Sequence, residues 1–275
     1  MGKLRLVAVS LLALAACGDD GGGSTPQDGG GSADARPIDA PPIDMPPEVP
    51  YDYSCPTAPP TNIATTVTVG GVAQQLAGTS AGPATNVVIT AYRIESGGDQ
   101  LVDTQPATGA NGAFTTAQIA TNGTALNGYL KGTKANHWDT YLYPSSPLAQ
   151  SLTGVPVIMI TDANVELAET LGQVDQMPGN GVIGVALTDC ASPTPAQIPN
   201  ATIEVYSGST RVGDDTLDVG AILATVPDVQ GLYLVTNVPP GPVTVKATYY
   251  GHTFLENDVV SYADALTTAQ IKPGY

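Results

Sequence analysis

The sequence predicts an all-β protein in which two tandem antiparallel β-sandwiches, separated by one short helix, follow a disordered tether. Among the 275 residues, 31 are Gly and 24 are Pro, whereas only 12% are charged. This composition is typical of many short strands joined by turns. From about residue 61, short apolar segments are set between Gly, Pro, Asn and Asp. We divide the chain into residues 1–16, 17–56, 57–175 and 176–275.

The amino terminus is typical of an export signal. Lys3 and Arg5 precede an apolar stretch, Leu6–Ala16, that is about half the length a membrane-spanning helix needs. Leu14-Ala15-Ala16-Cys17 resembles the bacterial lipobox, in which the cysteine thiol is acylated and becomes the new amino terminus. That resemblance implies a signal peptide at 1–16, a lipid on Cys17 and a membrane-anchored protein of the bacterial cell envelope, at the outer membrane or periplasmic face. An ordinary secretory peptide is the alternative.

The segment after Cys17 is predicted to be a disordered spacer. Residues 18–50 contain no aromatic residue and are rich in Gly, Pro and Asp, so they cannot bury enough surface to offset their ordering entropy. We extend the tether to residue 56. The whole chain has a formal charge of −16, and because Lys3 and Arg5 lie before Cys17, a chain starting there has 7 − 25 = −18. This acidity repels phosphate backbones, so we expect no nucleic acid among the partners.

Strands are expected in both halves, with one helix between them. The sequence predicts a helix over Asp162–Leu171, capped by Asp162 and terminated by Gly172. Its Val165, Ala168 and Leu171 should share one apolar face. Asn111-Gly112 predicts a hairpin turn. The expected strands are Thr65–Val69, Asn86–Ile94, Ala113–Ile119, Gly128–Thr133, Thr140–Tyr143, Val155–Ile160, Val182–Thr188, Ala201–Tyr206, Leu232–Asn237, Val243–Tyr249 and Leu266–Ile271.

The second half resembles the carboxypeptidase regulatory-like domain, which has a transthyretin-like (prealbumin-like) antiparallel β-sandwich. Three pieces of sequence carry the resemblance: Pro199–Tyr206, Asp228–Ala247 and Gly251. The pattern also has a direct physical reading. Val243, Val245 and Ala247 point inward from a pleated strand, while the residues between them face water. The order of two sandwiches with a helical joint is also similar to a group of uncharacterised bacterial surface lipoproteins.

The first half reads as a divergent copy of the second. Asn86–Tyr92 matches Asn200–Tyr206 in type, and the Gly112 turn matches the Gly231 turn. The pentapeptide Thr-Thr-Ala-Gln-Ile occurs at 115–119 and at 267–271, but its distance from the two Asn anchors differs. We interpret that identity as chance.

Two cysteines remain once Cys17 is assigned to the lipid. Cys55 and Cys190 are an even pair in a chain expected to enter an oxidising compartment, which favours a disulfide. The alternative is two independent thiols, with Cys190 buried as a small hydrophobic side chain.

Two short stretches carry residues suited to chemistry. In His137-Trp138-Asp139, a carboxylate could orient a histidine base, or the indole could contact a sugar ring. The favoured interpretation is a partly buried Trp beside a surface His, with Trp138 and His137 as ligand-contact candidates. Asp214, Asp215 and Asp218 form a weak Ca²⁺ candidate, against the plainer interpretation of an exposed acidic loop.

These observations predict a non-enzymatic envelope lipoprotein that needs no cofactor. Its sandwiches would bind a polysaccharide or another envelope protein, an expectation based on fold analogy. The alternatives are a purely structural spacer, or a hydrolase that uses His137 and Asp139.

Overall fold

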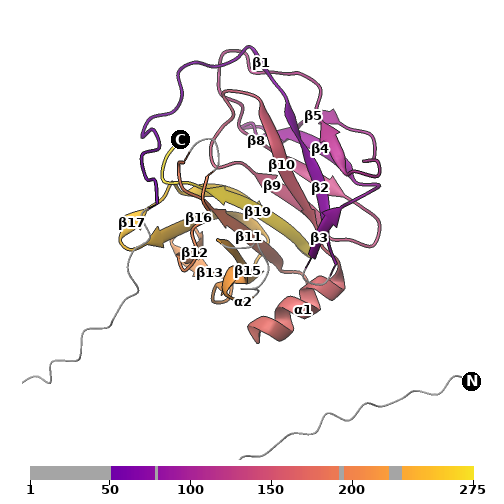
Figure 1. Ribbon diagram of the computed structural model, residues 1–275, viewed down its shortest axis with the longest axis vertical. Helices are drawn as coiled ribbons and strands as arrows, with labels where there is room; N and C mark the ends of the chain where they lie inside the picture. The colour runs from indigo at the N-terminus through magenta and orange to yellow at the C-terminus, as the bar shows by residue number, and fades with distance from the viewer. Residues whose placement is uncertain (1–50, 78–79, 192–194, 223–230) are drawn as a thin grey trace, which may run out of the picture. The chain divides into compact units, whose positions relative to one another are not determined.

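The computed structural model describes residues 51–77, 80–191, 195–222 and 231–275 (Figure 1). The predicted signal peptide, Cys17 and the tether up to residue 50 lie outside these ranges. Within the described ranges, no helix has the length and apolar composition to cross a membrane.

The first half of the body, here the N-terminal sandwich, consists of short strands. They are β1 (Thr66–Val67), β2 (Val69–Ala77), β3 (Ser80–Pro83), β4 (Val88–Arg93), β5 (Gln100–Thr104), β6 (Ala113–Thr115), β7 (Ile119–Ala120), β8 (Gly128–Thr133), β9 (Asp139–Tyr143) and β10 (Leu152–Met159).

A helix, α1 (Asp162–Gly172), follows the N-terminal sandwich and leads to the second half, here the C-terminal sandwich. The elements of the second half are β11 (Gly181–Leu187), β12 (Thr202–Ser207), β13 (Thr210–Val212), β14 (Leu217–Asp218), the single-turn α2 (Val219–Ile222), β15 (Leu232–Val238), β16 (Gly241–Tyr249), β17 (His252–Thr253), β18 (Asn257–Ser261) and β19 (Ala265–Ile271).

The two sandwiches repeat one pairing pattern. β2 pairs with β6 and β10, β4 with β5 and β8, and β8 with β9. In the same way β11 pairs with β15 and β19, β12 with β13 and β16, and β16 with β18. The marker residues agree, since Asn86 and Asn200 both have φ 59°, while Gly112 and Gly231 have φ 67° and 68°. The repeat predicted from these residues is therefore present in the fold.

Parallel pairing departs from the purely antiparallel expectation. β10 lies parallel to β2, β19 lies parallel to β11, and β19 also lies parallel to β9. Parallel neighbours need a long crossover, and many residues of chain separate the strands of each of these pairs. The β9–β19 pairing joins both halves into one eight-stranded sheet, in the order β14-β15-β11-β19-β9-β8-β4-β5. The described residues from 51 onward accordingly belong to one structural unit.

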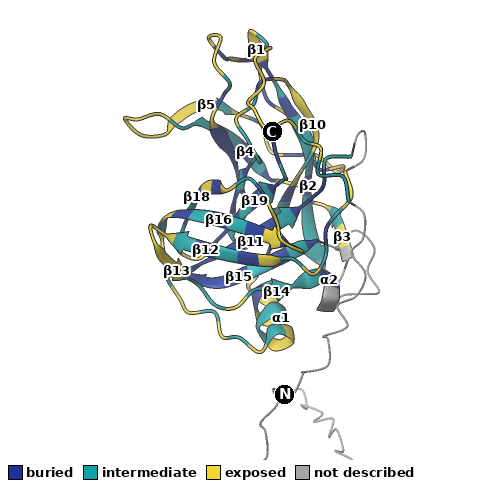
Figure 2. Cartoon of the chain, turned by 90° about the vertical axis from the view of Figure 1, so that its left-hand side faces the viewer, coloured by how far each residue is buried: buried dark blue, intermediate teal, exposed yellow. Residues whose placement is uncertain are grey.

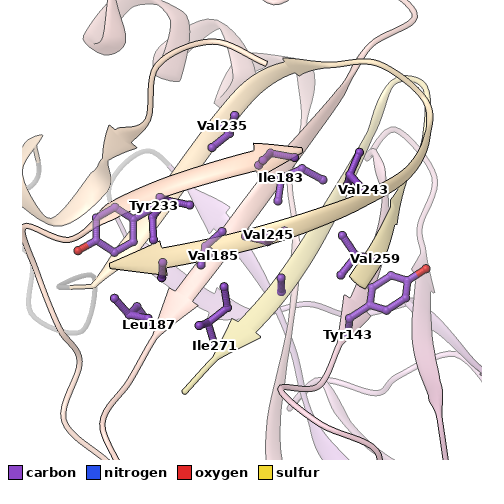
Figure 3. Close-up of a cluster of buried hydrophobic side chains, with 14 of the residues drawn as sticks. Tyr143, Ile183, Val185, Leu187, Tyr233, Val235, Val243, Val245, Val259 and Ile271 are labelled. Atoms are coloured by element: carbon purple, nitrogen blue, oxygen red, sulfur yellow. The ribbon is translucent and has the colours of Figure 1, made fainter. Parts of the chain in front are cut away.

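Apolar side chains fill each sandwich. Val243, Val245 and Ala247 of β16 are buried as predicted, and strands β12 and β16 show the alternation of buried and more exposed residues in Figure 2. Figure 3 shows Val245 facing Val185 of β11, with Tyr233 of β15 beside them. The core of the C-terminal sandwich continues onto Tyr129, Tyr141 and Tyr143 of the N-terminal one, so the two halves share buried surface.

The helix is observed where it was predicted and begins at the same residue, but its caps differ. Thr161 is the N-cap in place of Asp162, and the side chain of Asn164 accepts hydrogen bonds from its N–H (2.9 Å) and hydroxyl (3.0 Å). Gln173, with φ 54°, takes the left-handed position after Gly172. Only Val165 of the expected apolar face is buried, and Leu171 is 42% exposed.

The Gly112 turn does not close a hairpin. The preceding strand, β5, pairs with β4, whereas the following strand, β6, pairs with β2. The turn instead carries the chain from one sheet of the sandwich to the other, which its local sequence cannot reveal.

The shared sheet predicts that the two halves unfold together. We expect one cooperative transition in urea, reported equally by tyrosine fluorescence and by backbone circular dichroism. A chain ending at residue 175 should fail to give a stable sandwich, because the rings of Tyr129, Tyr141 and Tyr143 would be exposed to water without the C-terminal sandwich. Two separate transitions in the full chain would contradict this prediction.

Candidate functional site

Trp138 is a packing residue between the helix and the sheet. Its ring lies partly buried against a small cluster that includes Ile160, Val165 and Leu266. Its indole N–H donates to Oδ1 of Asp162 at 2.8 Å, in the first turn of α1. Both the ring and its polar edge are therefore engaged within the protein, which agrees with the favoured interpretation of a partly buried Trp.

We expect Trp138→Ala to lower the free energy of unfolding by about 2–3 kcal/mol, because it removes partly buried ring surface and the bond to Asp162. Urea denaturation measures this loss. The control is His137→Ala, which should change stability by less than about 0.5 kcal/mol, as expected for a surface substitution. Equal stabilities for the two variants would show that Trp138 does not hold the helix.

His137 and Asp139 do not form a catalytic pair. Nδ1 of His137 lies 2.9 Å from the carbonyl oxygen of Ala135. Oδ2 of Asp139 lies 2.8 Å from Nζ of Lys131, whose ammonium sits 5.1 Å from the centre of the Tyr141 ring. Burial alone would lower the pKa of Lys131, but hydrogen bonds to Asp139 and Tyr141 outweigh it and the pKa is raised. The carboxylate required by the hydrolase alternative is thus directed to a lysine.

The three aspartates of the Ca²⁺ candidate each contact different protein groups. Asp214 accepts hydrogen bonds from Thr236 (2.8 Å) and from the amide of Asn237 (2.5 Å). Asp215 pairs with Arg211 at 3.0 Å, and Asp218 accepts from the backbone N–H of Asn200 at 3.2 Å. Across the described ranges, no group of three or more His, Cys, Asp or Glu side chains is placed to hold a metal ion.

Asp214 has a structural role, which depends on its contact with Asn237. This buried residue has φ 56°, accepts a hydrogen bond from the N–H of Met177 and donates one to the carbonyl of Asp175. Asp214 and Asn237 together therefore fasten the connector between α1 and β11 to strand β15.

Residues 51–56, here called the stem, form the most unusual contact of the body. The sequence predicts that they end the disordered tether, whereas the structure holds them against the C-terminal sandwich. Cys55 and Cys190 form a disulfide, with Cα atoms 5.2 Å apart. The N–H of Cys190 donates to the carbonyl of Asp52 (2.8 Å), and the N–H of Tyr275 to the carbonyl of Pro56 (2.9 Å).

Aromatic contacts also hold the stem against the C-terminal sandwich. Tyr53 stacks on His252 with ring centres 3.9 Å apart and meets Phe254 edge-on at 6.2 Å. Tyr51 meets Tyr249 edge-on at 5.6 Å, and burial, together with Tyr249 and Asp189, raises the pKa of Tyr51. The prediction that the disordered tether extends to residue 56 is therefore wrong for residues 51–56, whose rings and cysteine bind the body.

The stem closes one wall of a shallow pocket of about 250 Å³. Its lining includes Asp189, a buried carboxylate that accepts backbone hydrogen bonds from Asp52, Ala191 and Ala196. The pocket is lined by Ser54, Cys55, Pro56, Asp189, Cys190, Ala191, Pro195, Lys272 and Tyr275. Sequence reasoning identified only the cysteines, because the other residues come from distant parts of the chain.

A cluster of tyrosines at the junction of the two sandwiches also escaped sequence reasoning. Tyr129 stacks with Tyr92 and with Tyr143 at 5.0 Å, and Tyr141 stacks with Tyr262 at 3.7 Å. Burial, and then hydrogen bonds to Tyr262 and Asp99, raise the pKa of Tyr129. The i, i+2 spacing of Tyr141 and Tyr143 on β9 indicated that both side chains lie on one face of a strand. That this face is buried could not be predicted, because it depends on β19 pairing with β9.

Comparison with known proteins gives no family. No family model matches the chain, and no curated protein matches it either. Among solved structures, GBS52, the minor pilin of Streptococcus agalactiae, is 12% identical, with 75% of this chain and 95% of that chain covered and a TM-score of 0.26. The shaft pilin SpaA of Lactobacillus rhamnosus GG is 10% identical, with 77% and 99% covered and a TM-score of 0.25. These scores are too low to argue from, so the fold assignment rests on the strand pairing described above.

Proposed function

We propose that this protein is a non-enzymatic lipoprotein of the bacterial cell envelope, anchored through a lipid on Cys17. Residues 18–50 act as the spacer, and the two sandwiches form the displayed binding or structural module. The observation that supports this proposal most directly is the disulfide at the point where the spacer meets the body.

A cross-link at this point suits a tethered body. The chain continues from the stem into the N-terminal sandwich, but the disulfide ties the stem to Cys190, just after β11. Tension in the spacer would therefore pass through the disulfide to the C-terminal sandwich before it reaches β1 and β2. A disulfide of this kind also fits the oxidising compartments outside the cytoplasm.

The anchor is tested by expressing the full chain and its Cys17→Ser variant in a bacterial host. The parent chain should fractionate with membranes, and mass spectrometry should find an acylated amino-terminal Cys17. The variant should lose the lipid and leave the membrane fraction. An unmodified, soluble parent chain would refute the lipoprotein proposal without bearing on the fold.

A polysaccharide or a second envelope protein is the partner we propose for the displayed module. A glycan array and a pull-down from envelope extracts, both with the chain from residue 18 onward, test the two classes. His137→Ala is the suitable variant at the predicted contact, because Trp138 also supports the helix. Absence of any ligand in both assays would favour the spacer alternative.

The likeness to the carboxypeptidase regulatory-like domain is also a proposal. Its support is the antiparallel pairing of β12 with β16, in which Ile203 lies opposite Ala247 and Val205 opposite Val245 on the buried face. This arrangement is what the quoted residues require if they form a transthyretin-like sandwich.

A further inference from the structure

The pocket at the stem exposes the disulfide to small molecules. Cys55 and Cys190 are both only partly buried, and both line the pocket of about 250 Å³ that opens to solvent. A disulfide buried in a core can be attacked only after unfolding, whereas one in an open pocket can be reached in the native protein.

A basic residue contributes to the pocket. Lys272 lines it, and an ammonium brought close to the sulfur atoms would stabilise a thiolate as it attacks or leaves. The carboxylate of Asp189 also lies there, but three backbone N–H groups donate to its two oxygens and offset its charge. The carboxylate of Asp52 is turned to the N–H of Ser54, at 2.8 Å.

The other contacts of the stem are noncovalent. Its backbone makes hydrogen bonds to Asp189, Cys190 and Tyr275, and the rings of Tyr51 and Tyr53, each partly buried, pack against Tyr249, His252 and Phe254. Ordering six residues costs conformational entropy of a size similar to what such contacts return. The covalent bond therefore decides whether the stem stays docked.

We propose that this pocket is a thiol–disulfide exchange site and that a dithiol reductant acting there releases the stem from the C-terminal sandwich. A thiolate of the reductant bonds to one cysteine sulfur as the S–S bond breaks, and the other cysteine leaves as a thiolate and takes up a proton. The second thiol of the reductant then displaces the first cysteine. The products are two protein thiols and one oxidised dithiol, with two electrons transferred.

The test uses the full chain, without denaturant, and dithiothreitol as the probe. Differential alkylation and mass spectrometry measure the rate at which Cys55 and Cys190 become free thiols. Hydrogen exchange reports release, since the amides of Cys190 and Tyr275 bond to the stem. We expect reduction under native conditions, with protection of these two amides falling about tenfold or more while β11 and β19 stay protected.

Two lysine variants separate an electrostatic role from a general effect. Lys272→Gln should slow reduction about threefold at low salt. Lys134→Gln, whose ammonium contacts Gln75 in the N-terminal sandwich, should leave the rate unchanged. Three results would overturn the proposal: a disulfide that is reduced only in denaturant, stem amides that stay protected after reduction, and a body that unfolds when the bond is broken.

Discussion

Replacing Cys55 and Cys190 together by serine lowers the free energy of unfolding by about 4–5 kcal/mol on the chain-entropy account of cross-links. The bond joins residues 135 apart in sequence, so it closes a loop that contains the whole N-terminal sandwich and α1. The cross-link restricts the unfolded chain far more than the folded one, because in the folded chain its loss frees only the six residues of the stem. Urea denaturation of the double variant and the parent chain measures the difference.

The control for this prediction is the parent chain itself, reduced and alkylated under native conditions. It should match the double variant in stability, because both lack the cross-link and keep every other side chain of the body. A loss below about 1 kcal/mol in both samples would mean that the unfolded chain is already compact, so that closing the loop removes little of its conformational entropy.

Gly112→Ala and Gly231→Ala are each expected to cost about 3–5 kcal/mol. Both glycines have positive φ, at 67° and 68°, where an alanine is strained. Space is also lacking, since a Cβ at Gly112 would lie 2.3 Å from the carbonyl oxygen of Ala73, and one at Gly231 would lie 2.7 Å from the backbone nitrogen of Ile198. The contacts are to backbone atoms, which cannot move aside without disturbing a sheet.

Gly123→Ala provides the matched control for these two variants. Gly123 has φ 77°, but no atom lies within 4 Å of the position its Cβ would take. The substitution should therefore cost only the backbone strain, about 1–2 kcal/mol. If all three variants lost the same stability, close approach of the backbone would play no part at Gly112 and Gly231. The prediction for the repeated turns would then be wrong.

Strand prediction succeeded where apolar side chains alternate and failed at edges and glycines. β8 matches its predicted range, and β16 extends its range by two residues at one end. Most of β2 was missed because Gly70, Gly71, Gln74 and Gln75 interrupt its pattern. β5, β13 and β18 were missed because short strands with polar residues have little alternation to detect.

The candidate site was predicted in part. An even pair of cysteines in an exported chain indicated a disulfide, and the structure has that bond. Lys272, Asp189 and Tyr275 could not be found, because each becomes part of the pocket only when β11, β19 and the stem meet. His137 and Asp139 looked like a pair because they are close in sequence, but Lys131 of β8 lies nearer to the carboxylate.

By itself, the sequence determined the features that depend on local pattern: the alternation of β16, the helix at 162–171, the spacer composition and the repeat of Asn86 and Asn200. Tertiary structure decided which strands are neighbours, above all the parallel pairing of β9 with β19. Alternation specifies only which face of a strand is buried, and many partners satisfy that requirement equally. The choice among them is made by the simultaneous burial of distant side chains such as Tyr141 and Tyr262, which stack only because β19 returns alongside β9.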